Sequence, residues 1–196
     1  MENIDDLQRG VTVYCGSCPG ADPVFVECAR ELGAALASAG VPLIYGGGRM
    51  GLMHATAGAC RRAGGTTLSV IPGFMVERGW NDTDSTHTIV TADMSERKRT
   101  FAQRSQGVIA LPGGIGTMEE LSEIITWRQL GIFGGNIVIM NLHGYYDPYL
   151  GQLREAIRQG FMPADHAQLW AVTENAAEAV ALATAPTAPV HLHRKF

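Results

Sequence analysis

Three glycine-rich segments of this 196-residue chain have the composition of loops that bind a phosphate group. Each follows a short apolar run, and they begin at Gly16 (GSCPG), Gly46 (GGGRMG) and Pro112 (PGGIGT). Glycine lets backbone N–H groups come close to a phosphate, and a helix that starts after such a loop adds its positive end. One such loop is weak evidence because α/β turns use glycine anyway, but three together predict an anion site.

None of the three loops has the full pattern of a common nucleotide fingerprint. GGGRMG lacks the G-x-G-x-x-G spacing with an acidic residue about 20 positions later, and no Lys-Ser or Lys-Thr pair follows any loop. These differences disfavour ordinary binding of NAD or ATP.

The segment MSERKRT (94–100) carries three consecutive cations at the start of a predicted helix. If Ser95 is the N-cap, then Arg97, Lys98 and Arg99 fall in the first turn. Cations there oppose the helix dipole at a cost of about 0.3–1 kcal/mol each when exposed. A local rule broken in this way often marks a functional site, and an anionic ligand would relieve the conflict. The alternative is a solvated basic turn that Glu96 partly offsets.

Three carboxylates, Glu119, Glu120 and Glu123, lie in the first two turns of the helix predicted after PGGIGT. A carboxylate beside a phosphorylated sugar can orient water or stabilise an oxocarbenium-like state. Thr117 and Glu120 also have the spacing of a capping box, in which two side chains cap each other's backbone N–H groups. The residues alone therefore leave catalysis and capping open for Glu120.

The lysines and histidines favour neither a covalent cofactor nor a metal. Only Lys98 and Lys195 could form a Schiff base with pyridoxal phosphate, and neither has a supporting motif. The histidines share no metal-ligand spacing; those outside the C-terminal segment are His54, His87, His143 and His166. We expect no cofactor and no metal.

Cys15 and Cys18 form a CxxC pair between a predicted strand and a predicted helix, as in thioredoxin-like proteins. A thiol-redox protein is therefore an alternative, although it would need neither PGGIGT nor the basic cluster. The polar, acidic start MENIDDLQRG does not have the pattern of a targeting peptide, and no apolar run reaches the roughly 18 residues of a membrane span. We expect a cytoplasmic protein with reduced thiols.

The elements that must position these residues alternate between short strands and longer helices. Such alternation predicts one Rossmann-like α/β domain, a doubly wound parallel sheet with helices on both faces and its glycine loops at the carboxyl ends of strands. The predicted strands are 11–15, 42–45, 66–71, 86–91, 107–111, 136–140 and 168–172. The predicted helices are about 22–39, 51–63, 95 onward, 117–130, 147–159 and 174–184, with an irregular stretch at 73–85.

Composition agrees with this fold class. The chain is 46% hydrophobic and 17% charged, as is typical of globular proteins. Its net charge of −4 indicates no general attraction to nucleic acid or membranes. We expect one domain over residues 1–185, followed by a flexible Pro/Ala-rich tail at 186–196.

Three motifs together resemble the LONELY GUY (LOG) family of cytokinin riboside 5′-monophosphate phosphoribohydrolases. They are YGGGRMGLMH (45–54), MSERK (94–98) and PGGIGTMEELSEIITWRQLGIF (112–133), and VYCGSCPG is similar to the family's first loop. The match runs in order from about residue 11 to 185, and PGGxGTxxE with an upstream Arg-Lys pair is highly specific. The resemblance implies hydrolysis of AMP or an N6-substituted AMP to free base and ribose 5-phosphate. It also implies a homodimer with the active site beside the subunit interface.

By this resemblance, Arg97 and Glu120 are the expected catalytic pair. The expected substrate-binding residues are Ser17, Gly46, Gly47, Gly48, Met94, Lys98, Gly113, Gly114, Ile115, Gly116, Thr117, Met118, Glu119 and Thr126. Family members usually have serine at Cys18, and a glutamate often found nine residues after Val70 is replaced here by Gly79. Whether Glu77 substitutes for it stays open, as does the preference for N6-modified bases. A non-catalytic nucleotide-binding or sensor protein of the same fold is the alternative function.

Overall fold

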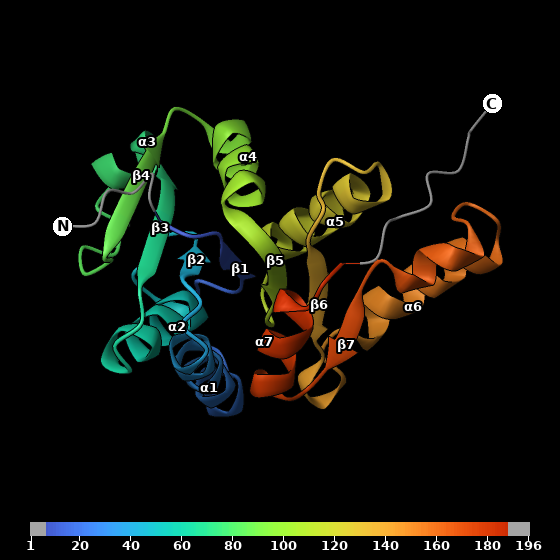
Figure 1. Cartoon of the computed structure of the whole chain (residues 1–196), viewed down its shortest axis with the longest axis horizontal. Helices are drawn as coiled ribbons and strands as arrows, with labels where there is room; N and C mark the ends of the chain where they lie inside the picture. The colour runs from blue at the N-terminus through green and yellow to red at the C-terminus, as the bar shows by residue number, and fades with distance from the viewer. Residues whose placement is uncertain (1–6, 188–196) are drawn as a thin grey trace.

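Seven parallel strands form the central sheet of the computed structural model, which describes residues 7–187 (Figure 1). Their order across the sheet is β4-β3-β2-β1-β5-β6-β7, and every pairing is parallel. The strands are β1 (Gly10–Tyr14), β2 (Leu43–Tyr45), β3 (Thr67–Pro72), β4 (His87–Thr91), β5 (Ser105–Ala110), β6 (Asn136–Met140) and β7 (Ala171–Thr173). The predicted doubly wound α/β fold is confirmed.

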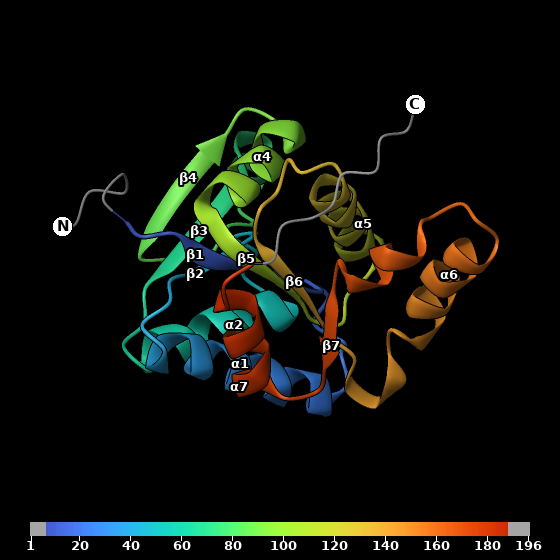
Figure 2. The same ribbon diagram turned by 45° about the vertical axis from the view of Figure 1, so that its right-hand side comes forward.

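Seven α-helices cover the two faces of this sheet within the described residues (Figures 1 and 2). They are α1 (Pro23–Ser38), α2 (Gly51–Arg62), α3 (Gly73–Glu77), α4 (Met94–Arg104), α5 (Ile115–Gln129), α6 (Asp147–Arg158) and α7 (Ala176–Thr184). Two single turns of 3₁₀ helix, Leu142–Gly144 and Ala164–Gln168, precede α6 and β7.

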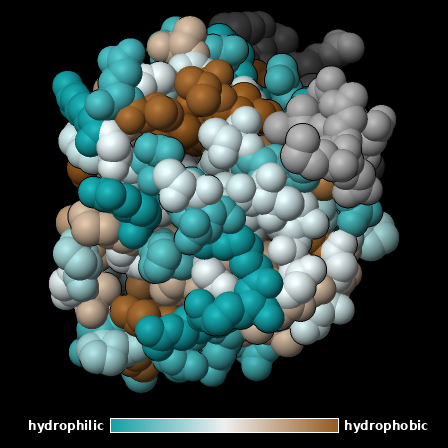
Figure 3. All heavy atoms as spheres, turned by 90° about the vertical axis from the view of Figure 1, so that its left-hand side faces the viewer, coloured by the Kyte–Doolittle hydropathy of each residue, from teal (hydrophilic) through white to brown (hydrophobic). Residues whose placement is uncertain are grey.

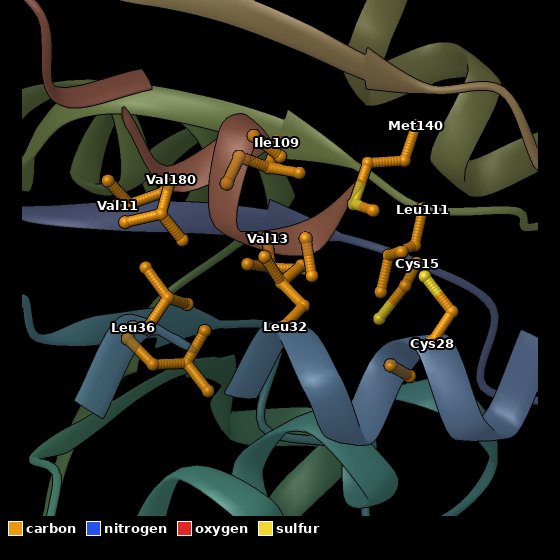
Figure 4. Close-up of a cluster of buried hydrophobic side chains, with 14 of the residues drawn as sticks. Val11, Val13, Cys15, Cys28, Leu32, Leu36, Ile109, Leu111, Met140 and Val180 are labelled. Carbon is orange, nitrogen blue, oxygen red and sulfur yellow. The ribbon is translucent and has the colours of Figure 1, made fainter. Parts of the chain in front are cut away.

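Alternate residues of each strand supply two separate cores, because successive side chains of a strand point to opposite faces. Val11 and Val13 of β1 pack with α1, α2 and α7 on one face. Figure 4 shows these two valines above Leu32 and Leu36 of α1. Tyr14 at the end of β1 belongs to the opposite core, which α4, α5 and α6 cover.

The predicted boundaries differ from the observed ones in a few places. The last strand begins at Ala171 rather than 168, because a 3₁₀ turn occupies Ala164–Gln168. The stretch predicted to be irregular contains the five-residue helix α3. Residues 188–196 of the predicted tail lie outside the described residues, so the domain boundary at 185 stays a prediction.

The predicted N-cap of α4 is wrong. Asp93, not Ser95, caps this helix, and its carboxylate accepts a hydrogen bond from the Glu96 N–H at 2.8 Å. The Glu96 carboxylate in turn accepts one from the Ala92 N–H at 2.6 Å. A carboxylate stabilises a helix start through both the cap and the dipole, and this places Arg97 just after the first turn. The predicted conflict with the dipole is therefore weaker than the sequence indicated.

The fold brings the three glycine loops together at one end of the sheet. β1 and β5 are neighbours, but the helices that follow them, α1 and α5, pack on opposite faces. Such a switch point opens a crevice at the carboxyl ends of the strands, where ligands bind. The Gly16 N–H donates to the Pro112 carbonyl at 3.0 Å, and the Gly16 carbonyl accepts from the Leu52 N–H at 2.9 Å. The predicted gathering of these loops is confirmed.

Within residues 7–187, no helix combines the length and hydropathy needed to cross a bilayer.

Candidate active site

Arg97 of α4 and Glu120 of α5 meet in the interior at this end of the sheet. Arg97 Nη2 lies 3.7 Å from Glu120 Oε1, and the two side chains are only 6% and 8% exposed. Arg97 Nη2 also donates to the Gly46 carbonyl at 3.4 Å, and its guanidinium lies 5.3 Å from the centre of the Phe101 ring. The arginine therefore joins α4, α5 and the loop after β2.

Gly46 leaves the space that this arginine occupies. A Cβ atom at Gly46 would collide with Arg97 Nη2 and would crowd the side chain of Met53. The next residue, Gly47, has a φ of +70°, a conformation that favours glycine. Glycine at position 46 therefore makes room for the Arg97 side chain.

Burial sets the protonation of Glu120. It raises the pKa of this carboxyl to about 7, while Arg97 and Lys98 act to lower the pKa and Glu119 and Glu123 act to raise it. A carboxyl with such a pKa exchanges its proton near neutral pH, as general acid–base catalysis requires.

Arg97 retains an unused hydrogen-bond donor. Its buried Nε has no hydrogen-bond partner among the described residues. Leaving a buried donor unpaired costs about 1–3 kcal/mol, so such an atom in a site indicates a missing ligand or water.

A cavity of about 370 Å³ opens beside Arg97. Its lining combines apolar side chains with a few polar groups, a combination that is typical of small-molecule sites. The lining residues are Ser17, Gly46, Gly48, Arg49, Met50, Met53, Ile71, Met75, Trp80 and Arg97.

The PGGIGT loop presents the start of α5 without a side-chain cap. Gly114 is the N-cap, so the helix begins at Ile115 and Thr117 lies inside its first turn. The capping box that the spacing of Thr117 and Glu120 allowed is therefore not formed, because neither side chain caps this helix. The first N–H groups of a helix have no partner within it, and they point toward an anion where one is bound.

Aromatic hydroxyls hold this loop in place. The Tyr145 hydroxyl donates to the Gly113 carbonyl at 2.5 Å, and the Tyr146 hydroxyl donates to the Leu111 carbonyl at 2.7 Å. Both tyrosines precede α6, so the HGYYDP segment holds the PGGIGT loop through two backbone carbonyls.

Lys98 lies between two of the three carboxylates. Its Nζ is 2.5 Å from Glu119 Oε1 and 3.1 Å from Glu123 Oε1. The hydrogen bond that Lys98 donates to Glu119 is the main cause of a raised pKa for Lys98. The ammonium therefore stays charged and links α4 to α5 beside the buried pair.

Several predicted site residues lie apart from the cavity lining. Thr126 is exposed on α5, where its hydroxyl donates to the Ser122 carbonyl at 2.9 Å. Glu77 is exposed at the end of α3, whereas the cavity takes Met75 and Trp80 from this region. Met94 contacts Arg97 through its sulfur, which accepts from Nη1 at 3.7 Å. Met118 is half-buried on α5.

The sequence reasoning missed the apolar part of the lining. Met50 and Met53 lie in the GGGRMGLM segment, for which a binding role was predicted only for the glycines. Met75 and Trp80 lie in a stretch that was predicted to be irregular. Large apolar side chains in such a stretch were the available signal, because an irregular segment rarely keeps them without a partner surface.

The first cysteine of the CxxC pair does not have the environment of a redox-active thiol. Cys15 is buried, and burial raises its thiol pKa, with a further contribution from Glu120. A redox-active cysteine needs a lowered pKa. Among the described residues, no group of three or more His, Cys, Asp or Glu side chains is arranged to hold a metal ion.

Comparisons with known proteins identify relatives of this chain. A family model described as "Possible lysine decarboxylase" matches residues 53–183. A probable cytokinin riboside 5′-monophosphate phosphoribohydrolase, LOGL1 of Oryza sativa subsp. japonica, is 42% identical over 81% of this chain and 71% of its own length. The cytokinin riboside 5′-monophosphate phosphoribohydrolase LOG5 of Arabidopsis thaliana is 36% identical over 92% of this chain and 79% of its own.

Solved structures show the same fold. The molybdenum cofactor carrier protein of Chlamydomonas reinhardtii superimposes with a TM-score of 0.68 and 23% identity, over 89% of this chain and 95% of its own. The molybdenum cofactor binding protein of Rippkaea orientalis gives 0.65 and 20%, over 87% and 93%. At these identities the likeness establishes the fold alone.

Proposed function

This chain belongs to the LOG family, and from that premise we propose that it is a nucleoside 5′-monophosphate phosphoribohydrolase. It hydrolyses the N-glycosidic bond of AMP or an N6-substituted AMP, and it releases the free base and ribose 5-phosphate. The observation that carries this proposal is the buried contact of Arg97 with Glu120, 3.7 Å apart, beside a cavity that Arg97 lines.

The 5′-phosphate is held at the start of α5. Gly114 leaves the first N–H groups of this helix without a side-chain cap, and their partial positive charge suits an anion. The hydrogen bond from Tyr145 to the Gly113 carbonyl keeps the loop in one conformation, so that little ordering is needed on binding. The base lies on the apolar side of the cavity.

Glu120 acts at the anomeric carbon. Water adds to C1′ while the bond to the base breaks and positive charge develops on the ribose. The ionised carboxylate of Glu120 stabilises this charge or takes the proton of the attacking water, and its pKa of about 7 suits both roles at neutral pH. The attacking water loses one proton overall and the departing base gains one, so the hydrolysis balances.

Arg97 positions the ligand and supports departing negative charge. Its Nε is buried and has no partner among the described residues, so it can donate to a bound nucleotide without breaking an existing hydrogen bond.

Decarboxylation of lysine, which the family model's description mentions, is not favoured by the lysine of this site. A Schiff-base lysine must lose its proton to act as a nucleophile. Lys98 lies within 3.1 Å of two carboxylates, and its pKa is raised. The binding-only alternative is less favoured, because the curated relatives are named as hydrolases.

We also propose a cytoplasmic homodimer with its site near the interface. Ile115, the first residue of α5, and Ile132, which follows the helix, are 85% and 65% exposed, and large exposed apolar side chains of this kind suit a subunit interface. All four cysteines are free thiols, as is usual in reducing compartments. Light scattering at micromolar concentration tests the dimer, and a monomer would contradict it.

The direct test is product analysis. The purified chain is incubated with AMP and separately with N6-isopentenyl AMP, and free base is separated by chromatography. Release of adenine or isopentenyladenine supports the proposal, and the ratio of the two rates identifies the preferred substrate. Binding of both nucleotides without release of base would support the sensor alternative instead.

A further inference from the structure

Trp80 is a large aromatic side chain that lines the cavity and remains 48% exposed. It follows Gly79, whose φ of +67° turns the chain after α3. On the side of the molecule where β4 and α3 lie, hydrophobic side chains gather near the top of the space-filling view (Figure 3). Among the described residues near α3, Phe74 and Trp80 are exposed large hydrophobic side chains.

The backbone around Trp80 is attached to the glycine loop of the site. The Trp80 carbonyl accepts from the Arg49 N–H at 3.3 Å, and its own N–H donates to the Met75 carbonyl at 3.1 Å. One residue later, Asn81 forms an isolated antiparallel bridge with Gly48. The indole is therefore carried on a segment that is fixed to the cavity wall.

Asp82 fixes this segment to the interior. Its N–H donates to the Gly47 carbonyl at 2.7 Å, and its carboxylate accepts from the Tyr45 hydroxyl at 2.8 Å and from Arg61 at 3.1 Å. Because the backbone is held from both sides, a ligand that contacts Trp80 need not order it first.

Arg78 lies against the ring without closing the cavity. Its guanidinium carbon is 5.1 Å from the centre of the Trp80 ring and 5.4 Å from that of Phe74. Arg78 is not among the residues that line the cavity. Such a cation–π contact holds the indole in place and leaves its other contacts available.

From these contacts we propose that Trp80 is the platform on which the base of the nucleotide stacks. The inference rests on the proposed function and adds a residue that determines substrate affinity. The indole supplies a flat π-surface in the cavity that Arg97 also lines, and the three methionines of the lining add adaptable apolar groups to the same cavity. A stacking surface recognises the face of a base and not its edge. Trp80 therefore contributes equally to nucleotides with and without an N6 substituent.

Steady-state kinetics of Trp80→Ala and Trp80→Phe test the platform. Loss of base stacking on an aromatic side chain weakens binding by roughly 5- to 150-fold. We expect Trp80→Ala to raise KM by that factor for AMP and for N6-isopentenyl AMP alike, with a smaller change in kcat. Trp80→Phe, which keeps a ring, should stay within about 5-fold of the wild type. Inhibition by ribose 5-phosphate, which has no base, should be unchanged.

Phe161→Ala is the matched control, because Phe161 is 85% exposed and lies after α6, away from α3 (Figure 1). It should leave both KM values unchanged. An unchanged KM in Trp80→Ala overturns the platform. This holds even if the variant changes its oligomeric state, because Trp80 would then be a subunit contact. A KM increase for only one of the two nucleotides also overturns it, because the contact would then be with the N6 substituent.

Fluorescence separates this inference from the proposed function, because it needs no turnover. If the base stacks on Trp80, AMP should quench the tryptophan emission of the wild type. The chain has three tryptophans, so Trp80→Phe should remove that quenching while the other two still emit. Quenching that survives in Trp80→Phe overturns the platform. Quenching that depends on Trp80 in a chain that releases no base would refute the proposed hydrolysis and keep the platform.

Discussion

Lys98 Nζ lies 2.5 Å from Glu119 Oε1, one residue along from the buried contact of Arg97 with Glu120. Two adjacent residues of α4 thus pair with two adjacent residues of α5, but in different environments. The outer pair is partly exposed and links the helices, whereas the inner pair is nearly inaccessible to water. The two pairs therefore differ in burial, and the proposed chemistry is assigned to the inner one.

Glu120→Gln tests the inner carboxylate. The substitution keeps the shape of the side chain but removes the charge that the mechanism places at the anomeric carbon. We expect kcat for AMP to fall by about 10²–10⁴, the usual scale for one acid–base group. Circular dichroism confirms that the variant is folded, and near-normal turnover in a folded variant would refute the assignment.

Arg97→Ala tests the partner of Glu120. It removes the buried guanidinium that contacts Gly46 and Glu120, so kcat/KM should fall by about 10²–10³. Arg97→Lys keeps the charge but not the planar geometry, and it should recover little of the loss. Full activity in the lysine variant would mean that positive charge alone is needed here.

Gly46→Ala tests whether the glycine serves the arginine. The added methyl group would occupy the position of Arg97 Nη2, so Arg97 must move and kcat should fall by at least about tenfold. Gly20→Ala is the matched control, because a Cβ atom there meets no atom within 4 Å. Equal activities of the two variants would contradict this account of Gly46.

The neighbours of Glu120 should move the pH profile in opposite directions. If the ionised carboxylate is the active form, activity rises with pH through a pKa of about 7. Lys98 acts to lower this pKa and Glu123 acts to raise it. Lys98→Met should therefore shift the limb of the kcat profile to higher pH, and Glu123→Gln should shift it to lower pH. Shifts in the same direction would contradict the proposed electrostatics.

The raised pKa of Glu120 should also make the stability of the folded chain depend on pH. The folded-state pKa of Glu120, about 7, lies above its ordinary value of 4.5, so the folded chain binds more protons than the unfolded chain between these values. The contribution of Glu120 to stability is thus fully present below about pH 4.5 and is lost as the pH rises through 7. Thermal unfolding from pH 5 to 8 should show the Tm of Glu120→Gln rising relative to the wild type. A constant difference in Tm across this range would count against the raised pKa.

The Thr117–Glu120 spacing shows where prediction from sequence stopped. A threonine followed three residues later by a glutamate fits both a capping box and a catalytic carboxylate. Whether a capping box can form depends on where the helix begins. In the fold, α5 begins two residues before Thr117, at Ile115, with Gly114 as its N-cap, and the Pro112 carbonyl just ahead of it accepts a hydrogen bond from the Gly16 N–H. Similarly, Asp93 displaced Ser95 as the cap of α4 because its carboxylate reaches the Glu96 N–H.

The alternation of strands and helices and the position of the glycine loops could be predicted from the amino-acid sequence, because both depend on local apolar periodicity and backbone freedom. The sequence also singled out Arg97 and Glu120 through motifs. That these two side chains meet could not be predicted locally, because their contact requires β1 to lie beside β5 and α4 to pack against the same face as α5. The place of Trp80 in the cavity was likewise a tertiary matter, since Gly48 and Asn81 pair across 33 positions of the chain and no local pattern encodes that pairing.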